Sequence, residues 1–270
     1  MAMQKQDFGT LLRSWRQRRR FSQLDLANEA EISQRHLSFM ESGRSQPSRD
    51  MVLRLCEYLN VPLRERNAIL HAAGFASFYT EPDFSAPELE SARGIIERIL
   101  KGNDPNPALA VDRNWNLISA NQGVGVLLKG VAQHLLVGNV NVLRLSLHPE
   151  GLASRILNYT EWRNHILHRL ARDIETSADD QLALLRDELA SYPDPLQKNP
   201  SQKASRQPDS ESLKGIAVPL RISSEERTLE FLSTTTVFGT AVNITLAGIV
   251  IESFYPSNPE TAAAMRKLIS

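Results

Sequence analysis

The sequence predicts an all-α domain of five short helices, followed by an α+β domain with one five-stranded antiparallel sheet and helices over one face. Three observations predict this arrangement. Apolar residues recur at helical spacing throughout the first 76 residues. Two short apolar runs flank a turn-rich segment at 112–116, and three strand-like runs close the chain. Residues 77–87 contain two prolines and little apolar periodicity, so we expect a linker there.

The first domain, residues 1–76, contains repeated helix-capping signals. Ser22 and Ser33 precede apolar-periodic runs and are good N-cap residues, and Gly43 is placed to end the third helix. We expect helices at 8–19, 23–30, 34–42, 49–59 and 62–74. The inward face of the second helix would carry Leu24, Leu26, Ala27 and Ala30.

The second domain, residues 88–270, mixes both periodicities. Its clearest local signal is a hairpin, with Ala108–Val111 and Leu117–Ala120 on either side of the turn. The other expected elements are a helix at 88–100, helices within 150–190, and strands at 216–222, 228–238 and 242–253. Residues 192–214 are rich in Ser, Gln and Lys and hold four prolines, so we expect a mobile loop.

Composition limits the classes of protein. Apolar residues make up 41% and charged residues 23% of 270, which is typical of a soluble globular protein and excludes collagen-like, coiled-coil and wholly disordered chains. One cysteine excludes an internal disulfide framework. No apolar run approaches the roughly 20 residues needed to span a bilayer. Residues 1–6 lack the apolar core of a signal peptide. We therefore expect a cytoplasmic protein with no membrane partner.

The net charge of zero hides an asymmetry. Residues 1–76 hold 12 Lys and Arg against 8 Asp and Glu, a net charge of +4, and five arginines fall between Arg13 and Arg20. A basic end on a neutral chain is typical of a nucleic-acid partner, but a solvated helix end gives the same pattern. Charge alone does not separate these two interpretations.

The first domain resembles the Cro/repressor-like (XRE) helix-turn-helix family. The matching segments are SQLDLA at 22–27, IS at 32–33, LSFMESG at 37–43 and PS at 47–48. The resemblance implies that the third helix enters the major groove of DNA. Glu31 stands where the family usually has glycine. If that position is left-handed, Glu31 is strained by about 1 kcal/mol.

The outer face of the third helix supplies the candidate DNA contacts. Arg35 has the donor fork that recognises guanine, Gln34 suits adenine, and Phe39 suits a thymine methyl group or packing on a neighbouring helix. The resemblance assigns Gln23 as a phosphate clamp. The full set of DNA-contact candidates is Gln23, Ser33, Gln34, Arg35, His36, Ser38, Phe39, Arg44 and Ser45.

The second domain resembles the MmyB-like ligand-binding domain. The matching segments are NVLRLSLHPEGL at 141–152, the nearby Asn158, Tyr159 and Trp162, STTTVFGT at 233–240, ESFYP at 252–256 and VDRNW at 111–115. Asn243 departs from the pattern, because an acidic residue is expected there. The resemblance implies a PAS-like fold and a small apolar effector, of the fatty-acyl class, held non-covalently between the sheet and its helices.

Four residues are the ligand candidates. Arg144 could pair a carboxylate and His148 could orient a head group, while Tyr159 and Trp162 could line the pocket. Structural roles compete with each of these. Arg144 could instead pair with Glu161 or Glu252, His148 could cap a turn, and the two aromatic residues could fill the core.

No catalytic or metal-binding constellation is apparent in the sequence. There is no phosphate-binding glycine-rich loop and no nucleophile elbow. Glu161, His165 and His168 share the spacing of a metal-binding helix face, but such a face is usually solvated. Cys56 lies on the inward face of a helix, which favours the core over a nucleophile.

These observations together predict a DNA-binding transcriptional regulator rather than an enzyme. A homodimer would place two recognition helices about 34 Å apart, so we expect an inverted-repeat operator in double-stranded DNA. The alternative is an interaction adaptor or antitoxin-like partner, in which the second domain serves dimerisation alone. The salt dependence of DNA affinity separates the two, because displaced phosphate counterions make DNA binding fall steeply with salt.

Overall fold

The structure is a computed structural model that describes residues 7–195, 217–224, 227–239 and 241–269. The chain divides into two compact units. The first comprises Met1–Asp83 together with Thr240–Ala247, and the second comprises Phe84–Gly239 together with Gly248–Ser270. Each unit has its own buried core.

Five helices form the first unit, close to their predicted bounds. They are α1 (Phe8–Arg18), α2 (Gln23–Glu29), α3 (Gln34–Glu41), α4 (Arg49–Tyr58) and α5 (Leu63–Ala72). Ser22, Ser33 and Ser48 each accept a hydrogen bond from a backbone amide of the helix that they precede, as good N-cap residues do. Leu24 does not face inward as predicted, since 51% of its surface is exposed.

Residues 77–83, predicted as part of a linker, pack on the first unit. The side chain of Asn67 on α5 holds this segment by three hydrogen bonds. Its Oδ1 accepts from the amides of Phe78 (3.0 Å) and Tyr79 (3.1 Å), and its Nδ2 donates to the carbonyl of Tyr79 (2.8 Å). These bonds satisfy two amides and one carbonyl of a segment that has no regular secondary structure.

The first unit also contains a piece of chain that the sequence places in the second domain. The short helix α11 (Ile244–Ala247) packs against α5. The amide of Ile244 donates to the carbonyl of Thr80 (2.9 Å), and the hydroxyl of Thr245 donates to the carbonyl of Pro82 (2.5 Å). The predicted strand at 242–253 is therefore wrong in its first half, which is helical and belongs to the first unit.

The second unit is built on one antiparallel sheet in the order β2-β1-β5-β4-β3. The strands are β1 (Ala108–Val111), β2 (Leu117–Ala120), β3 (Leu220–Ser224), β4 (Arg227–Val237) and β5 (Val250–Pro256). The helices are α6 (Glu90–Gly102), α7 (Gln122–Leu127), α8 (Val142–Leu147), α9 (Tyr159–Ser177), α10 (Asp180–Ser191) and α12 (Pro259–Ile269), with short 3₁₀ turns at Pro87–Leu89, Gln133–Leu136 and Ala153–Arg155. The predicted hairpin is confirmed, and the five-stranded α+β domain is as expected.

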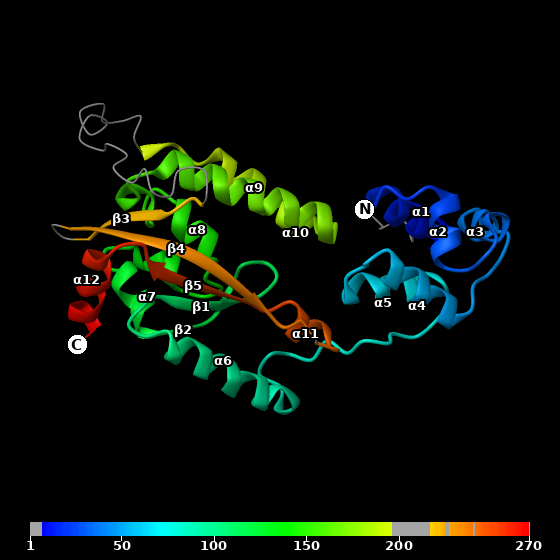
Figure 1. Cartoon of the computed structure of the whole chain (residues 1–270), viewed down its shortest axis with the longest axis horizontal. Coiled ribbons are helices and arrows are strands. Elements are labelled where there is room, and N and C mark those ends of the chain that lie inside the picture. Colours follow the sequence, from blue (N-terminus) through cyan, green and yellow to red (C-terminus); the bar gives the residue numbers. More distant parts are fainter. Residues whose placement is uncertain (1–6, 196–216, 225–226, 240, 270) are drawn as a thin grey trace. The chain divides into compact units, whose positions relative to one another are not determined.

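Helices cover both sides of this sheet rather than one. Helices α8, α9 and α10 lie on one side, and α6 lies on the other, against β1 (Figure 1). All four residues of β1 are consequently buried. The predicted loop at 192–214 falls mostly on residues 196–216, which are outside the described residues.

The register of the sheet brings three side chains into one row. Leu109 on β1 pairs with Glu252 on β5, which in turn pairs with Thr235 on β4. Ser233 and Phe254 form the next row on the same face, because side chains alternate along a strand. From these two rows, the cavity described below is lined by Leu109, Glu252, Ser233 and Phe254.

Candidate functional sites

A buried ion pair fixes α3 against α1. The carboxylate of Glu41, at the end of α3, accepts from Arg16 Nε (2.5 Å) and Nη2 (3.0 Å). Gln23 Nε2 also donates to it (2.8 Å). Burial alone raises the pKa of Glu41, but the hydrogen bonds from Arg16 and Gln23 outweigh it and hold the pKa below its ordinary value. The amide of Gln23, predicted to clamp a phosphate, is thus engaged with α3.

The N-terminal turn of α3 presents an open polar face. The hydroxyl of Ser33 accepts from the amide of His36 (3.1 Å) and caps the helix. Gln34, Arg35 and His36 are all exposed. The structure therefore brings the candidate base-contacting side chains together on one turn, next to amides that attract anions.

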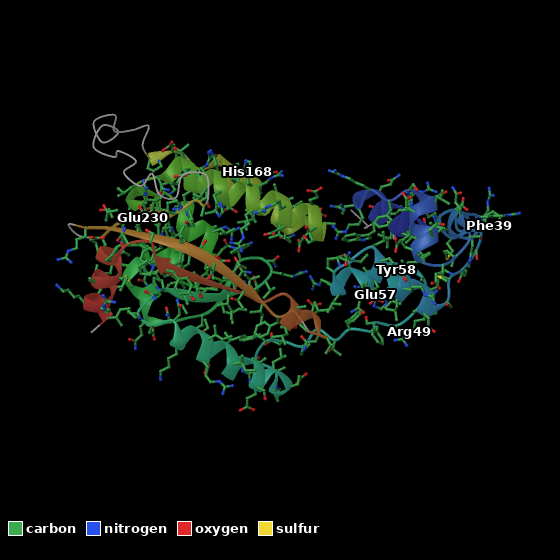
Figure 2. All side chains as sticks on the ribbon, viewed as in Figure 1. Phe39, Arg49, Glu57, Tyr58, His168 and Glu230 are labelled. Atoms are coloured by element: carbon green, nitrogen blue, oxygen red, sulfur yellow. The ribbon has the colours of Figure 1, made fainter. Side chains whose placement is uncertain are left out.

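Phe39 lies between two arginines on this helix face. The guanidinium of Arg35 lies 5.2 Å from the centre of the Phe39 ring, and that of Arg44 lies 5.8 Å from it. Phe39 is half-buried, and Figure 2 places it on α3. Its carbonyl accepts from the amides of Arg44 (2.8 Å) and Ser45 (3.2 Å). Phe39 therefore organises both arginines through its ring, and the start of the following loop through its backbone.

The turn before α3 has the strained geometry that the sequence suggests. Glu31 has a φ of 53°, in the left-handed region where glycine is favoured. The next residue, Ile32, donates its amide to the carbonyl of Ala27 (2.9 Å) and closes the turn. The turn between α2 and α3 is thus closed with a glutamate at a glycine position.

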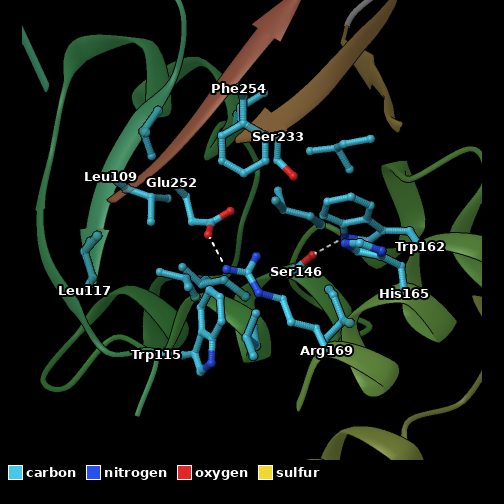
Figure 3. Close-up of a pocket in the computed structure, with 18 of the residues that line it drawn as sticks. Leu109, Trp115, Leu117, Ser146, Trp162, His165, Arg169, Ser233, Glu252 and Phe254 are labelled. Atoms are coloured by element: carbon cyan, nitrogen blue, oxygen red, sulfur yellow. Dashed lines mark hydrogen bonds and ion pairs between the residues drawn. The ribbon is translucent and has the colours of Figure 1, made fainter. Parts of the chain in front are cut away.

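The second unit encloses a largely apolar cavity between the sheet and α9 (Figure 3). The cavity is partly open to solvent. The apolar lining residues are Leu109, Trp115, Leu117, Val124, Leu127, Leu128, Val142, Leu143, Leu145, Leu152, Trp162, Ile166, Leu170, Leu220 and Phe254. Polar groups in the lining come from Ser146, His165, Arg169, Ser233 and Glu252. A cavity of this composition suits an apolar molecule that carries a small polar end.

An ion pair occupies the polar end of the cavity. Arg169 Nη2 on α9 donates to Glu252 Oε1 (2.6 Å) and to Thr235 Oγ1 (3.0 Å), and Thr235 donates to the same carboxylate oxygen (2.9 Å). The guanidinium also lies 4.4 Å from the centre of the Trp115 ring. Figure 3 shows the pair spanning the cavity from helix to sheet. Arg169 is thereby held in place on three sides.

His165, one turn before Arg169, lines the same end. Its ring stacks on Trp162, with the ring centres 5.5 Å apart. Burial and the nearby charges of Arg169 and Arg172 lower the pKa of His165, so the imidazole is neutral near pH 7. The indole of Trp162 donates to the hydroxyl of Ser146 (2.9 Å), whose own proton is left to donate.

Of the four predicted ligand residues, Trp162 lines the cavity and the other three are not among its lining residues. Arg144 makes a two-pronged ion pair with Glu188, with Nε–Oε1 and Nη2–Oε2 distances of 2.7 Å each. His148 accepts from the amide of Glu150 within its turn (3.1 Å). Tyr159 is fully buried and donates to the carbonyl of Leu147. These three side chains therefore make the structural contacts that the sequence offered as alternatives to ligand binding. The partner of Arg144 is Glu188 rather than Glu161 or Glu252.

The sequence does carry a signal for the residues that were missed. Arg169 follows Trp162 and Ile166 at helical spacing and so interrupts an apolar stripe with a charge. Glu252 alternates with Val250 and Phe254 and so places an acid on the inward face of a strand. Arg169 and Glu252 are each a charged residue on a face that is otherwise apolar, and this pattern indicates a buried ion pair.

The structure does not support a metal site at Glu161, His165 and His168, or a nucleophile at Cys56. Glu161 and His168 are exposed while His165 lines the cavity, so the three do not share one solvated face. Cys56 is buried in the helical core, and burial raises the pKa of its thiol to about 12. At neutral pH the thiol is protonated, which makes it a poor nucleophile. Among the described residues, no helix has the length and apolarity that a membrane crossing requires.

Comparison with known proteins gives two family matches. The model of the MmyB-like transcription regulator ligand binding domain matches residues 92–268, and a helix-turn-helix domain model matches residues 7–69. Both are domains of regulators. Among solved structures, the clp gene regulator ClgR from Corynebacterium glutamicum is 22% identical, with 38% of this chain and 97% of that chain covered and a TM-score of 0.23. The curated proteins contain no match.

Proposed function

Because the chain belongs to the family of MmyB-like transcription regulators and is a DNA-binding regulator, we propose that a small apolar effector of the fatty-acyl class controls its binding to DNA. The effector would occupy the cavity between the sheet and α9. The helical unit would bind an inverted-repeat operator as a homodimer, with the two recognition helices one DNA turn apart.

One observation carries this proposal. Strands β4 and β5 contribute Ser233, Glu252 and Phe254 to the cavity, and the chain that joins these two strands belongs to the helical unit. A ligand that changes the spacing or twist of these strands therefore acts on a segment that is hydrogen-bonded within the DNA-binding unit. For regulation, the ligand must bind one conformation of the chain more tightly than another.

The roles on DNA divide by chemistry. Arg35 and Gln34 would contact base edges, because guanidinium and amide groups form paired hydrogen bonds with guanine and adenine. Ser33, His36, Ser38, Arg44 and Ser45 surround this turn and would hold phosphates, which fixes the register of the protein on the duplex. Gln23 would act through Glu41, and so through the position of α3, as well as on the backbone of the DNA.

The first experiment is mass spectrometry of small molecules extracted from the denatured, freshly purified protein. We expect a stoichiometric fatty-acyl compound that alters operator affinity when added back. Ser233→Phe fills the cavity and should abolish this response. Thr234→Phe, on the opposite face of the same strand, should retain it. A response that survives Ser233→Phe would contradict the proposed site.

The DNA half of the proposal is tested separately. Operator affinity should fall steeply between 50 and 200 mM salt, because several phosphate counterions are released (on the order of 10³-fold for six contacts). Arg35→Ala should cost about 1–3 kcal/mol on the operator and little on unrelated DNA. A flat salt dependence would instead support the adaptor function.

A further inference from the structure

The polar end of the cavity carries no net charge to offer a ligand. Among the described residues that line it, Arg169 and Glu252 are the only Arg, Lys, Asp or Glu, and they are paired at 2.6 Å. The side chain of Glu252 is 5% exposed and that of Arg169 is 20% exposed. Water therefore does little to screen either charge, and each depends on the other.

Asp173 and the Trp115 ring add negative character around Arg169, and Arg172 adds a positive charge nearby. Asp173, one turn along α9, is half-buried and close enough for the charge of Arg169 to act on it. The ring of Trp115 presents its electron-rich face to the guanidinium. His165 is neutral near pH 7. Arg169 thus has its charge satisfied before any ligand arrives.

An incoming carboxylate would meet two unfavourable choices in this site. Beside the intact pair, it would lie next to the carboxylate of Glu252, and like charges at short range repel strongly in a buried site. If it displaced Glu252 from Arg169, that acid would be left buried without its cation. An uncharged polar end faces neither problem. It can bond to the hydroxyls of Ser146 and Ser233, both of which line the cavity (Figure 3).

We propose that the cavity selects an acyl-chain molecule whose polar end is uncharged, such as an alcohol or an ester, over the free carboxylate. This inference rests on the proposed function, because it names the ligand class for the same cavity. It also assigns Arg169 and Glu252 as the pair that sets the selectivity.

The test compares three ligands with one chain length: 1-dodecanol, methyl dodecanoate and dodecanoate. Each is titrated into the full-length protein, freed of co-purified lipid, at pH 7.5 and below its aggregation concentration, and binding is measured by calorimetry. In the wild-type protein, dodecanol and the ester should bind about tenfold or more tightly than dodecanoate. Tighter binding of dodecanoate would overturn the inference.

Glu252→Gln provides the second arm, since it leaves Arg169 without its carboxylate. Dodecanoate should then bind about tenfold more tightly than it does to the wild-type protein, and the order of the ligands should reverse. Glu188→Gln removes an acid that pairs with Arg144 outside the cavity, so it should keep the wild-type order. An unchanged order in Glu252→Gln would overturn the role of the pair. Should that variant not fold, as judged by circular dichroism, the wild-type order alone decides.

The two proposals fail in different ways. If none of the three ligands binds the wild-type protein, the effector site itself is wrong, and the selectivity falls with it. If all three bind and dodecanoate binds best, the effector site stands and the selectivity alone is refuted.

Discussion

Arg16 and Glu41 form a two-pronged ion pair in the core of the helical unit, with both side chains almost fully buried. The pair joins α1 to the end of α3, the helix that carries the candidate base contacts. Gln23, at the start of α2, donates to the same carboxylate. The Glu41 carboxylate therefore joins α3 to both α1 and α2, and the orientation of α3 depends on the charge of Glu41.

The first prediction is that Glu41 makes the stability of this unit depend on pH. Its pKa in the folded state lies below the ordinary value of 4.5. The carboxylate therefore contributes its full stability above pH 4.5 and loses it as the pH falls through the lower, folded-state pKa. Glu41→Gln leaves the buried guanidinium of Arg16 without a counter-charge and should cost about 3 kcal/mol at pH 7.

Hydrogen exchange of the α1 and α3 amides, followed by mass spectrometry, measures this cost within the unit. The difference between wild type and Glu41→Gln should shrink as the pH falls from 7 towards 3. Glu57→Gln, at an exposed position on α4, is the control and should leave exchange in α1 and α3 unchanged. A difference that stays constant with pH would show that Glu41 does not act through its charge.

The second prediction concerns the strained turn at Glu31. Glycine adopts its φ of 53° without a clash, so Glu31→Gly should stabilise the helical unit by about 0.5–1 kcal/mol. Asn60 has a φ of 46° after α4, and asparagine tolerates this region better, so Asn60→Gly should gain less. Urea unfolding of both variants makes the comparison. Destabilisation by Glu31→Gly would mean that the glutamate side chain contributes more than its strain costs.

The third prediction assigns Phe39 a positioning role on DNA. Phe39→Leu keeps an apolar side chain but removes the ring that both Arg35 and Arg44 approach. Operator affinity should fall about five- to thirtyfold, because two arginines lose a contact of about 0.5–1 kcal/mol each. Phe78→Leu removes a ring that contacts Arg49 instead and should leave operator affinity unchanged. An equal loss in both variants would indicate a general effect on folding.

The helical unit was predictable from sequence because its signals are local. Serine caps at Ser22 and Ser33, apolar spacing and Gly43 determine where helices begin and end, and none of these depends on distant residues. The 108–120 hairpin was predictable for the same reason. The start of β5 was not, because Val242 to Ile249 has strand-like composition, and contacts with Thr80 and Pro82 more than 160 residues away accompany its helical conformation.

The cavity residues were harder to predict for a related reason. Arg144 stands in the motif that carries the family resemblance, but its partner is Glu188, 44 residues along the chain. Arg169 and Glu252 lie 83 residues apart and meet only when α9 covers the sheet. A sequence shows that each is a charge on an apolar face. Which charges share a cavity is set by the packing of helix on sheet, and that is not encoded in any short segment.

The last prediction tests how ligand and DNA binding are coupled. Thr245→Val removes the hydroxyl that donates to the carbonyl of Pro82 and leaves the volume of the side chain almost unchanged. Thr245 is neither on α3 nor in the cavity, so operator affinity without ligand and ligand affinity without DNA should both stay within about twofold of wild type. The change in operator affinity on adding ligand should shrink, because β4 and β5 would act on a segment that is less firmly held in the helical unit. Thr234→Val, on an exposed face of β4, is the matched control and should keep the full response. Fluorescence anisotropy of labelled operator, measured with and without ligand, gives the operator affinities, and calorimetry without DNA gives the ligand affinity. An undiminished response in Thr245→Val would show that the coupling passes through another part of the chain.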